Sequence, residues 1–214
     1  MIEVKNLFKK IDGNIILNNI NLKLDYGKIY GFQGHNGSGK TMLFRAICGL
    51  INIDSGEIIV DNKKIYDNDF LPDVGLLLEN PSFINGLSGF MNLKMIASIK
   101  NIACEKRILE VLDIVGLTDA KNKLYEKYSL GMKQRLAIAN VIMEDPKILI
   151  FDEPNNAIDK DGVEILKEII IKEKEKGKLI LISSHEKGII DELSYCIFNM
   201  ENGKIISKDY KLTN

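Results

Sequence analysis

The sequence has few cysteines, no surplus of basic residues and no long hydrophobic run. Cys48, Cys104 and Cys196 are odd in number and widely spaced, which argues against a disulfide framework or a zinc site and is typical of a reducing compartment. The 29 lysines and arginines are balanced by 30 aspartates and glutamates, so the net charge of −1 predicts no general attraction to nucleic acid or anionic lipid. No run approaches the roughly 18 consecutive apolar residues of a membrane span, and residues 1–5 do not begin a signal peptide. We therefore expect any role at a membrane to depend on a partner protein.

The composition is that of an ordinary folded protein. Of the 214 residues, 45% are hydrophobic and 28% are charged, which is enough apolar material to bury a sizeable core. The length predicts one domain, or one domain with an inserted subdomain. No linker, low-complexity tract or internal repeat divides the chain.

One glycine-rich segment has the spacing of a phosphate-binding loop (P-loop), G-x-x-x-x-G-K-[ST]. It lies between a strand predicted at 28–32 and a helix predicted at 42–50, which is the setting that such a loop requires. Successive backbone N–H groups at the helix start would surround a phosphate, Lys40 would reach the β- and γ-phosphates, and the Thr41 hydroxyl would bind Mg²⁺. The alternative is a glycine-rich turn that binds nothing. The residues predicted to bind the nucleotide here are Gly34, His35, Asn36, Gly37, Ser38, Gly39, Lys40, Thr41 and Met42.

Two apolar strands end in ionisable residues. The run 148–151 is followed by Asp152 and Glu153, and the run 179–182 is followed closely by His185. Ligand sites in open α/β sheets lie at the carboxyl ends of strands, where the P-loop also lies, so we expect one shared site. There Asp152 would help to hold Mg²⁺, Glu153 would orient and deprotonate the attacking water, and His185 would donate to a γ-phosphate oxygen. The alternatives are an acidic pair that begins a solvent-exposed loop and a surface histidine, and the P-loop favours the shared site.

The apolar pattern predicts an α/β domain whose first third is antiparallel. Residues 88–144 have helical periodicity throughout, and we interpret them as an inserted helical subdomain. An amphipathic helix between the two buried strands forms a crossover, which would place both strands in one sheet with the P-loop strand. We expect a single domain over residues 1–214, in which 1–87 and 145–214 form the α/β core with an antiparallel β subdomain. Strands are predicted at 2–8, 15–24, 57–60, 63–65, 74–78, 148–151, 179–182, 197–200 and 204–207.

With these motifs assembled, the chain resembles the ATP-binding subunit of ABC transporters over essentially its full length. The most specific element is the segment 128–135, Tyr-Ser-Leu-Gly-Met-Lys-Gln-Arg, which is similar to the family's signature L-S-G-G-x-x-Q-R. The resemblance implies a P-loop NTPase fold of the ABC type, with a mixed, mainly parallel core sheet, and Mg²⁺-dependent hydrolysis of ATP. It also implies a head-to-tail dimer, in which Ser129, Gly131 and Met132 contact ATP held by the opposite subunit and Asp159 crosses the interface.

Three positions depart from the family's pattern. Leu130 stands in place of the first signature glycine. Glu79 stands in place of the Q-loop glutamine; it could bind Mg²⁺ and ATP but cannot donate an amide hydrogen bond. Ile11 stands in place of the aromatic residue that stacks on adenine, so that apolar packing would remain. Leu130, Glu79 and the segment 183–185 are similar to the bacitracin- and lantibiotic-resistance branch of exporter ATPases.

The predicted function is an ATP-binding and ATP-hydrolysing subunit that powers a membrane transporter, and the branch implies export of a peptide antibiotic or similar amphiphile. ATP would close a dimer with a second copy or a paralogue, and hydrolysis would reopen it. Residues 79–100 would dock under a membrane-spanning permease, on the cytoplasmic inner face of the cell membrane. The alternative is a soluble clamp on nucleic acid or ribosomes. The single nucleotide-binding head, without a heptad insertion or a basic patch, argues against that alternative, and we expect no nucleic-acid partner. The intact Lys40, Asp152, Glu153 and His185 argue against a module that does not hydrolyse ATP.

Overall fold

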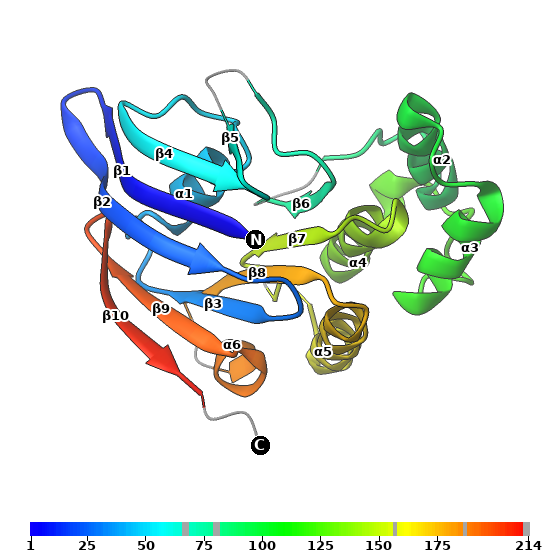
Figure 1. The fold of residues 1–214 in the computed structure, drawn as a ribbon. Helices are drawn as coiled ribbons and strands as arrows, with labels where there is room; N and C mark the ends of the chain where they lie inside the picture. Colours follow the sequence, from blue (N-terminus) through cyan, green and yellow to red (C-terminus); the bar gives the residue numbers. More distant parts are fainter. Residues whose placement is uncertain (66–68, 79–81, 156–157, 186–187, 212–214) are drawn as a thin grey trace.

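The computed structural model describes residues 1–65, 69–78, 82–155, 158–185 and 188–211, which form two sheets and a set of helices (Figure 1). The strands are β1 (Ile2–Ile11), β2 (Asn14–Leu24), β3 (Ile29–Gln33), β4 (Ser55–Val60), β5 (Lys63–Ile65), β6 (Val74–Leu77), β7 (Ile148–Asp152), β8 (Leu179–Ser184), β9 (Cys196–Glu201) and β10 (Lys204–Tyr210). The helices are α1 (Lys40–Ile47), α2 (Gly89–Lys100), α3 (Glu105–Ile114), α4 (Leu130–Met143), α5 (Lys160–Glu175) and α6 (Gly188–Leu193), with a short 3₁₀ turn at Tyr125–Lys127.

The first sheet is antiparallel and has the strand order β2-β1-β4-β5. The turn between β1 and β2 contains Asp12 and Gly13, both with positive φ, as tight hairpin turns require. Along β2, Ile20, Leu22 and Leu24 are buried and alternate with exposed residues, as the sequence predicts for a strand with one wet face.

The second sheet carries the P-loop and has the order β10-β9-β3-β8-β7-β6. Strands β9, β3, β8, β7 and β6 run parallel, and β10 pairs antiparallel with β9. The predicted crossover between β7 and β8 is therefore confirmed, because these strands are neighbours and β8 pairs in turn with the P-loop strand β3. Their carboxyl ends meet at one edge of the sheet, which brings the residues that follow them together.

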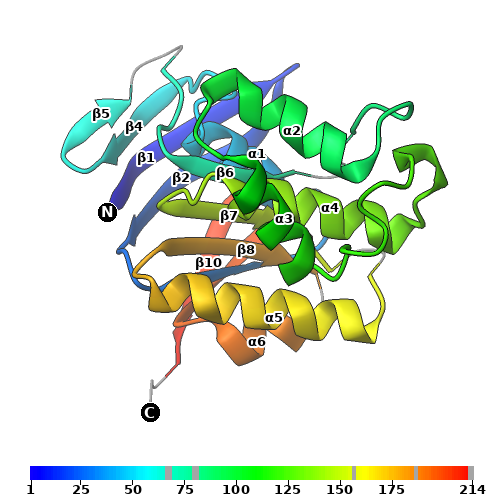
Figure 2. The ribbon, with the colours of Figure 1, turned by 90° about the vertical axis from the view of Figure 1, so that its right-hand side faces the viewer.

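Apolar side chains of the second sheet pack into two separate hydrophobic cores, one on each face. In β7, Ile148 and Ile150 pack with the antiparallel sheet and α1, whereas Leu149 and Phe151 pack with α4 and α5. This division follows from the strand geometry, in which successive side chains point to opposite faces. Figure 2 shows α5 crossing the helical side of the sheet, and Figure 1 shows α2 and α3 further out on that side. Both faces of β7 and β8 are thus covered, which explains their uninterrupted apolar sequences.

Several boundaries differ from the sequence-based prediction. The helix after the P-loop begins at Lys40, two residues earlier than predicted, and ends at Ile47 rather than at residue 50. It ends there because Cys48 caps it and Gly49, with φ of 72°, turns the chain away. The short helix α6 was not predicted. The predicted 88–144 block contains α2, α3 and α4, but its limits as a subdomain stay a prediction.

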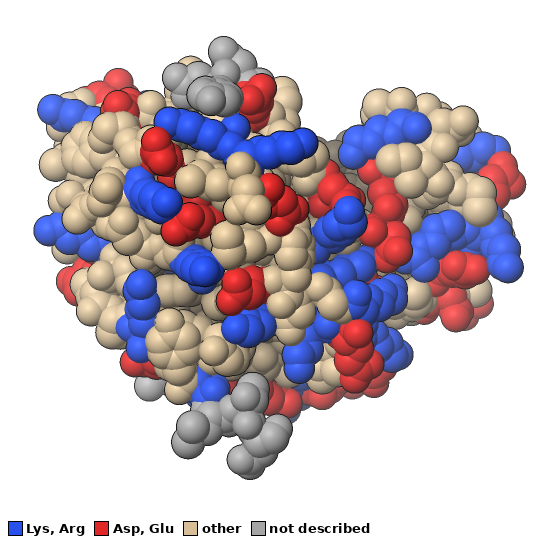
Figure 3. Space-filling view, viewed as in Figure 1, with Lys and Arg blue, Asp and Glu red and all other residues tan. Residues whose placement is uncertain are grey.

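Surface charge is mixed on the side of the molecule drawn in Figure 3, where Lys and Arg lie interspersed with Asp and Glu. Ion pairs of the protein include Lys9 with Asp54 and Lys64 with Glu57. Within the described part of the chain, no helix is both long enough and apolar enough to cross a membrane.

Candidate functional site

The P-loop connects β3 to α1 and is shaped by its glycines. Gly37 and Gly39 have φ of 82° and 108°, conformations that residues with a Cβ rarely adopt. A Cβ on Gly34 would lie 2.3 Å from the carbonyl oxygen of Met200, so this position also requires glycine. No described side chain caps the start of α1. The first backbone N–H groups of the helix are therefore available to an anion.

The Lys40 side chain folds back over the loop. Its ammonium donates to the carbonyl oxygen of Gly34 at 2.7 Å and to that of His35 at 3.4 Å. It also lies 3.5 Å from Glu153 Oε1. Lys40 is 5% exposed, and a buried ammonium is stable only when such partners compensate for its lost hydration. The lysine is thus held at the mouth of the loop, close to a carboxylate.

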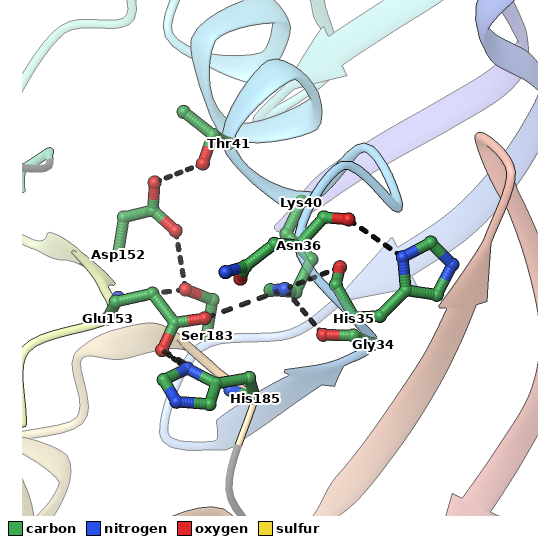
Figure 4. A network of polar contacts seen from close by, with 9 residues as sticks. All are labelled: Gly34, His35, Asn36, Lys40, Thr41, Asp152, Glu153, Ser183 and His185. Atoms are coloured by element: carbon green, nitrogen blue, oxygen red, sulfur yellow. Dashed lines mark hydrogen bonds and ion pairs between the residues drawn. The ribbon is translucent and has the colours of Figure 1, made fainter.

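Asp152 ends β7 and contacts the P-loop helix. Its Oδ2 accepts a hydrogen bond of 2.5 Å from the Thr41 hydroxyl, although the two residues are 111 positions apart in the chain. Its Oδ1 accepts a hydrogen bond of 2.5 Å from Ser183, which lies on the neighbouring strand β8. The structure therefore brings the predicted magnesium ligands Thr41 and Asp152 into direct contact (Figure 4).

Glu153 stands at the centre of the cluster. Its Oε2 accepts a hydrogen bond of 3.2 Å from the His185 backbone N–H and lies 2.9 Å from His185 Nδ1. Its Oε1 faces Lys40 and accepts no hydrogen bond from the described residues. Figure 4 shows the side chains of Lys40, at the start of α1, of Glu153, after β7, and of His185, after β8, gathered at one place. A carboxylate with one oxygen held and the other available is suited to accept a proton from water.

A cavity of about 360 Å³ opens at this cluster. It is lined by Ile16, Asn36, Gly37, Ser38, Gly39, Lys40, Thr41, Met42, Glu153 and His185. Most of the residues predicted to bind the nucleotide thus surround one hollow, together with both predicted catalytic partners of Lys40. Gly34 and His35 instead line a neighbouring cavity of about 690 Å³, which His185 also borders.

The apolar side of the cavity includes a residue that the sequence did not point to, and the predicted contact of Ile11 with adenine stays a prediction. Ile11, predicted to face adenine, is not among the lining residues and is 36% exposed. Ile16 lines the cavity instead, on the partner strand of the same hairpin. The alternation of β2 predicts only which face a residue takes, so no signal in the sequence marked Ile16 as part of the site.

The signature segment does not reach this cavity. Ser129 caps α4, and its hydroxyl accepts a hydrogen bond of 3.2 Å from the backbone N–H of Met132. Neither of these residues nor Gly131 lines the cavity, and Leu130 is 65% exposed. Further along α4, the Gln134 amide donates to the carbonyl oxygen of Pro154 at 3.1 Å, next to Glu153. The signature helix therefore contacts the catalytic loop through its side while its start faces outward.

Other predicted residues lie elsewhere or outside the described residues. Asp159 caps α5, where its Oδ1 accepts a hydrogen bond of 2.9 Å from the backbone N–H of Gly162. Glu79, a predicted ligand of ATP and Mg²⁺, falls outside the described residues. The roles assigned to these residues stay predictions.

The donors at the site fit a magnesium ion better than a transition metal. Thr41 and Asp152 offer one hydroxyl and one carboxylate, and Mg²⁺ in phosphate-transfer sites is held by few protein oxygens, with phosphate and water completing the shell. Among the described residues, no group of three or more His, Cys, Asp or Glu side chains could hold a metal ion alone. Thr41 and Asp152 are therefore the residues that could hold Mg²⁺ together with a bound phosphate.

Comparison with known proteins identifies the family. Residues 17–156 match the family described as ABC transporter. An uncharacterized ABC transporter ATP-binding protein of Bacillus subtilis (strain 168), YybJ, is 44% identical over 96% of this chain and 94% of its own length. The lantibiotic transport ATP-binding protein SrtF of Streptococcus pyogenes is 37% identical, over 98% and 91%. The bacitracin transport ATP-binding protein BcrA of Enterococcus faecalis is 35% identical, over 97% and 68%.

Solved structures agree with the sequence relatives. The dimeric structure of MJ0796, described as a bacterial ABC transporter cassette, superimposes with a TM-score of 0.90 at 25% identity, over the full length of both chains. The same cassette in a dimeric post-hydrolysis state, bound to ADP and Pi, gives a TM-score of 0.89.

The fold and the site define a nucleotide-binding cassette of the P-loop class. The chain belongs to the ABC transporter family. The predicted fold class and the predicted activity, ATP binding and hydrolysis in a subunit that powers a transporter, are thereby confirmed. Cassettes of this family act as dimers together with permease subunits. The match does not favour the alternative of a nucleic-acid clamp.

Proposed function

We propose that this chain powers the export of a peptide antibiotic or a similar amphiphile. The names of two relatives, SrtF and BcrA, associate them with lantibiotic and bacitracin transport. The observation that carries the mechanism is the cluster of Lys40, Glu153 and His185 beside the contact of Thr41 with Asp152. These groups gather where parallel strands end, which is where α/β proteins bind nucleotides.

In the proposed mechanism, ATP occupies the cavity with its phosphates in the P-loop. The N–H groups at the start of α1 and the Lys40 ammonium neutralise the β- and γ-phosphates, and Thr41 and Asp152 would hold Mg²⁺, which would supply further charge neutralisation. Glu153 Oε1 orients the attacking water and accepts its proton, while the His185 backbone N–H holds Oε2 and the His185 ring donates to the γ-phosphate. Ile16 provides apolar contact to the nucleotide, together with the predicted Ile11.

The second half of the proposal is a dimer in which each subunit completes the other's site. The exposed start of α4, with the Ser129 hydroxyl and the N–H group of Gly131, is suited to bind a γ-phosphate presented from outside the subunit, and the family resemblance assigns Met132, whose N–H donates to Ser129, to the same contact. Asp159 and Glu79 are assigned to the interface and to Mg²⁺ by the family resemblance. ATP would join the two subunits and hydrolysis would separate them.

The proposed docking surface for the permease lies on α2. Met91, Met95 and Ile99 recur at every fourth residue, so they lie on one face of the helix, and each is exposed. Exposed apolar stripes on a soluble domain commonly mark contact sites. Contact with a membrane-spanning subunit here, within the predicted 79–100 region, would hold the chain on the inner face of the membrane.

A Glu153→Gln variant tests this function. Glutamine keeps the shape of the side chain but cannot accept the proton, so we expect ATP to bind normally and turnover to fall at least about 100-fold. Expressed with a tag in the native cells, the ATP-trapped variant should sediment with membranes and co-purify a polytopic protein. Turnover equal to wild type would contradict the role of Glu153, and a variant that stayed soluble, alone or with nucleic acid, would contradict the transport role.

A further inference from the structure

Ser183 connects the two acidic residues of the site, through the Asp152 carboxylate and the Glu153 backbone N–H, yet no motif in the sequence singles it out. It is the fifth residue of β8, and its Cα pairs with that of Asp152 in the last rung of the parallel ladder between β8 and β7. Residues paired in this way present their side chains on the same face of the sheet. Its side chain is fully buried, and Figure 4 shows it between Asp152 and Glu153.

The Ser183 hydroxyl makes one hydrogen bond to each neighbour. Its oxygen accepts from the backbone N–H of Glu153 at 2.9 Å, and its proton is donated to Asp152 Oδ1 at 2.5 Å. The direction of both bonds is determined, because a peptide N–H can only donate and an ionised carboxylate can only accept. A side chain at this position must therefore accept and donate at once, which among small residues is the property of a hydroxyl.

Both residues that Ser183 contacts need to be held. Asp152 has one oxygen bound by Thr41, so the bond from Ser183 to the other oxygen removes its remaining freedom to rotate. Glu153 has φ of 50°, which is uncommon for a residue with a side chain and persists only where surrounding contacts stabilise it. Its N–H bond to Ser183 is such a contact.

We propose that Ser183 is a positioning residue for ATP hydrolysis, whose single hydroxyl sets the Asp152 carboxylate and the Glu153 backbone in register with each other. The inference rests on the functions proposed above for Asp152 and Glu153. Ser183 does not line the nucleotide cavity, so it acts on the reaction only through these two residues.

The proposal predicts a separation of turnover from binding. Ser183→Ala leaves a buried N–H and a buried carboxylate oxygen without their partner, but it leaves intact the P-loop groups that surround the phosphates. We expect kcat to fall about 10- to 100-fold, as when hydrogen-bonded supports of catalytic ligands are removed, with KM for ATP within about threefold of wild type. Ser183→Thr retains the hydroxyl and should keep kcat within about threefold.

Ser194→Ala is the matched control. Ser194 is also a buried serine, and its hydroxyl has no hydrogen-bond partner among the described residues. The substitution removes the same atom from a comparable environment outside the cavity, so kcat should stay at the wild-type value. A thermal melt of each variant, and titration with the fluorescent analogue mant-ATP in EDTA, would give the fraction of folded, binding-competent protein by which kcat is normalised.

The steady-state assay on the full chain compares wild type, Ser183→Ala, Ser183→Thr, Ser194→Ala and Glu153→Gln. A normalised kcat for Ser183→Ala no lower than that for Ser194→Ala would overturn the proposal, as would equal losses in the Ala and Thr variants. A rise in KM or loss of mant-ATP binding that accounted for the whole defect would overturn it too.

Glu153→Gln separates the two hypotheses. If that variant turns over like wild type, the catalytic role proposed for Glu153 fails; if it is inactive while Ser183→Ala is normal, only the role of Ser183 fails.

Discussion

At the scale of single residues, Lys40 shows how the site manages a buried charge. Its ammonium has three oxygen partners, the carbonyls of Gly34 and His35 and the carboxylate of Glu153. A γ-phosphate in the loop would add a further acceptor that carries more negative charge, so the same ammonium can move to the substrate without being left unpaired. The Lys40 ammonium is thus positioned, before ATP binds, by partners that attract it less strongly than a γ-phosphate would.

We expect Lys40→Ala to weaken ATP binding at least about tenfold, because it removes a charge-assisted contact to phosphate from a largely desolvated site. Equilibrium dialysis with labelled ATP measures the effect. Lys28→Ala is a suitable control. Lys28 precedes β3, at the end of the strand opposite the P-loop, and it forms a partly exposed ion pair with Asp25. Affinity in Lys40→Ala equal to that of the control would contradict the role given to Lys40.

At the scale of elements, a second ionic cluster joins the end of α5 to the turn between α4 and β7. Lys178 is buried and lies 2.5 Å from both Asp145 Oδ1 and Glu173 Oε2, while Lys176 lies 2.6 Å from Glu173 Oε1. Burial by itself would raise the pKa of Asp145, but the hydrogen bond and charge of Lys178 outweigh it and hold that pKa below its ordinary value. The cluster links the segments that precede β7 and β8, at the ends of these strands opposite the nucleotide cavity.

This lowered pKa makes stability depend on acidity. The contribution of Asp145 is fully present above the ordinary aspartate pKa of about 4 and is lost as the pH falls through the lower folded-state value. We expect Asp145→Asn to lower the free energy of unfolding at pH 7 by about 0.5 to 1 kcal/mol, a modest amount because the side chain is mostly exposed.

Urea unfolding at a series of pH values measures this contribution. The difference between Asp145→Asn and wild type should shrink as the pH is lowered from about 5 toward about 3. Asp119→Asn, which alters an exposed aspartate with no ion pair among the described residues, serves as control and should track wild type throughout. A difference that stayed constant with pH would show that the charge of Asp145 is not the cause.

At the scale of the whole molecule, the nucleotide cavity and the start of α4 are separate features of one subunit. Within a subunit, α4 reaches the catalytic loop through the bond from Gln134 to Pro154, while the signature residues at its start face outward. In the proposed dimer, a second subunit would place those residues over a bound nucleotide. The proposed head-to-tail dimer therefore uses the start of α4, which does not line the nucleotide cavity of its own subunit.

We expect Glu153→Gln with ATP to elute as a dimer in gel filtration coupled to light scattering, because the trapped nucleotide is not hydrolysed. Adding Gly131→Asp should return it to the monomer by placing a negative charge against the opposite γ-phosphate. An acidic residue in the first turn favours the helix itself, so loss of the dimer would not reflect loss of α4. A dimer that persisted in the double variant would contradict the assigned interface.

Three features were predictable because each depends only on residues close together in the sequence. They are the P-loop, the acidic pair and the alternation of the antiparallel strands. The same reasoning placed Asp152 and Glu153 at a strand end, and β7 does end there. It failed at Ile16, because which residue of a hairpin overhangs a cavity depends on how the two sheets pack. It also missed α6, a short helix in a stretch with little periodicity of its own.

The sequence by itself determined the class of this protein, since contiguous motifs specify a phosphate loop and a signature segment, and apolar periods of two and 3.6 specify strands and helices. Tertiary structure alone decided that Thr41 touches Asp152, that Lys40 faces Glu153 and that Ser183 joins the Asp152 carboxylate to the Glu153 backbone N–H. The physical reason is register. A hydrogen bond between strands depends on which residues stand opposite one another, and that is set by the packing of the whole sheet rather than by the residues next to them in the chain.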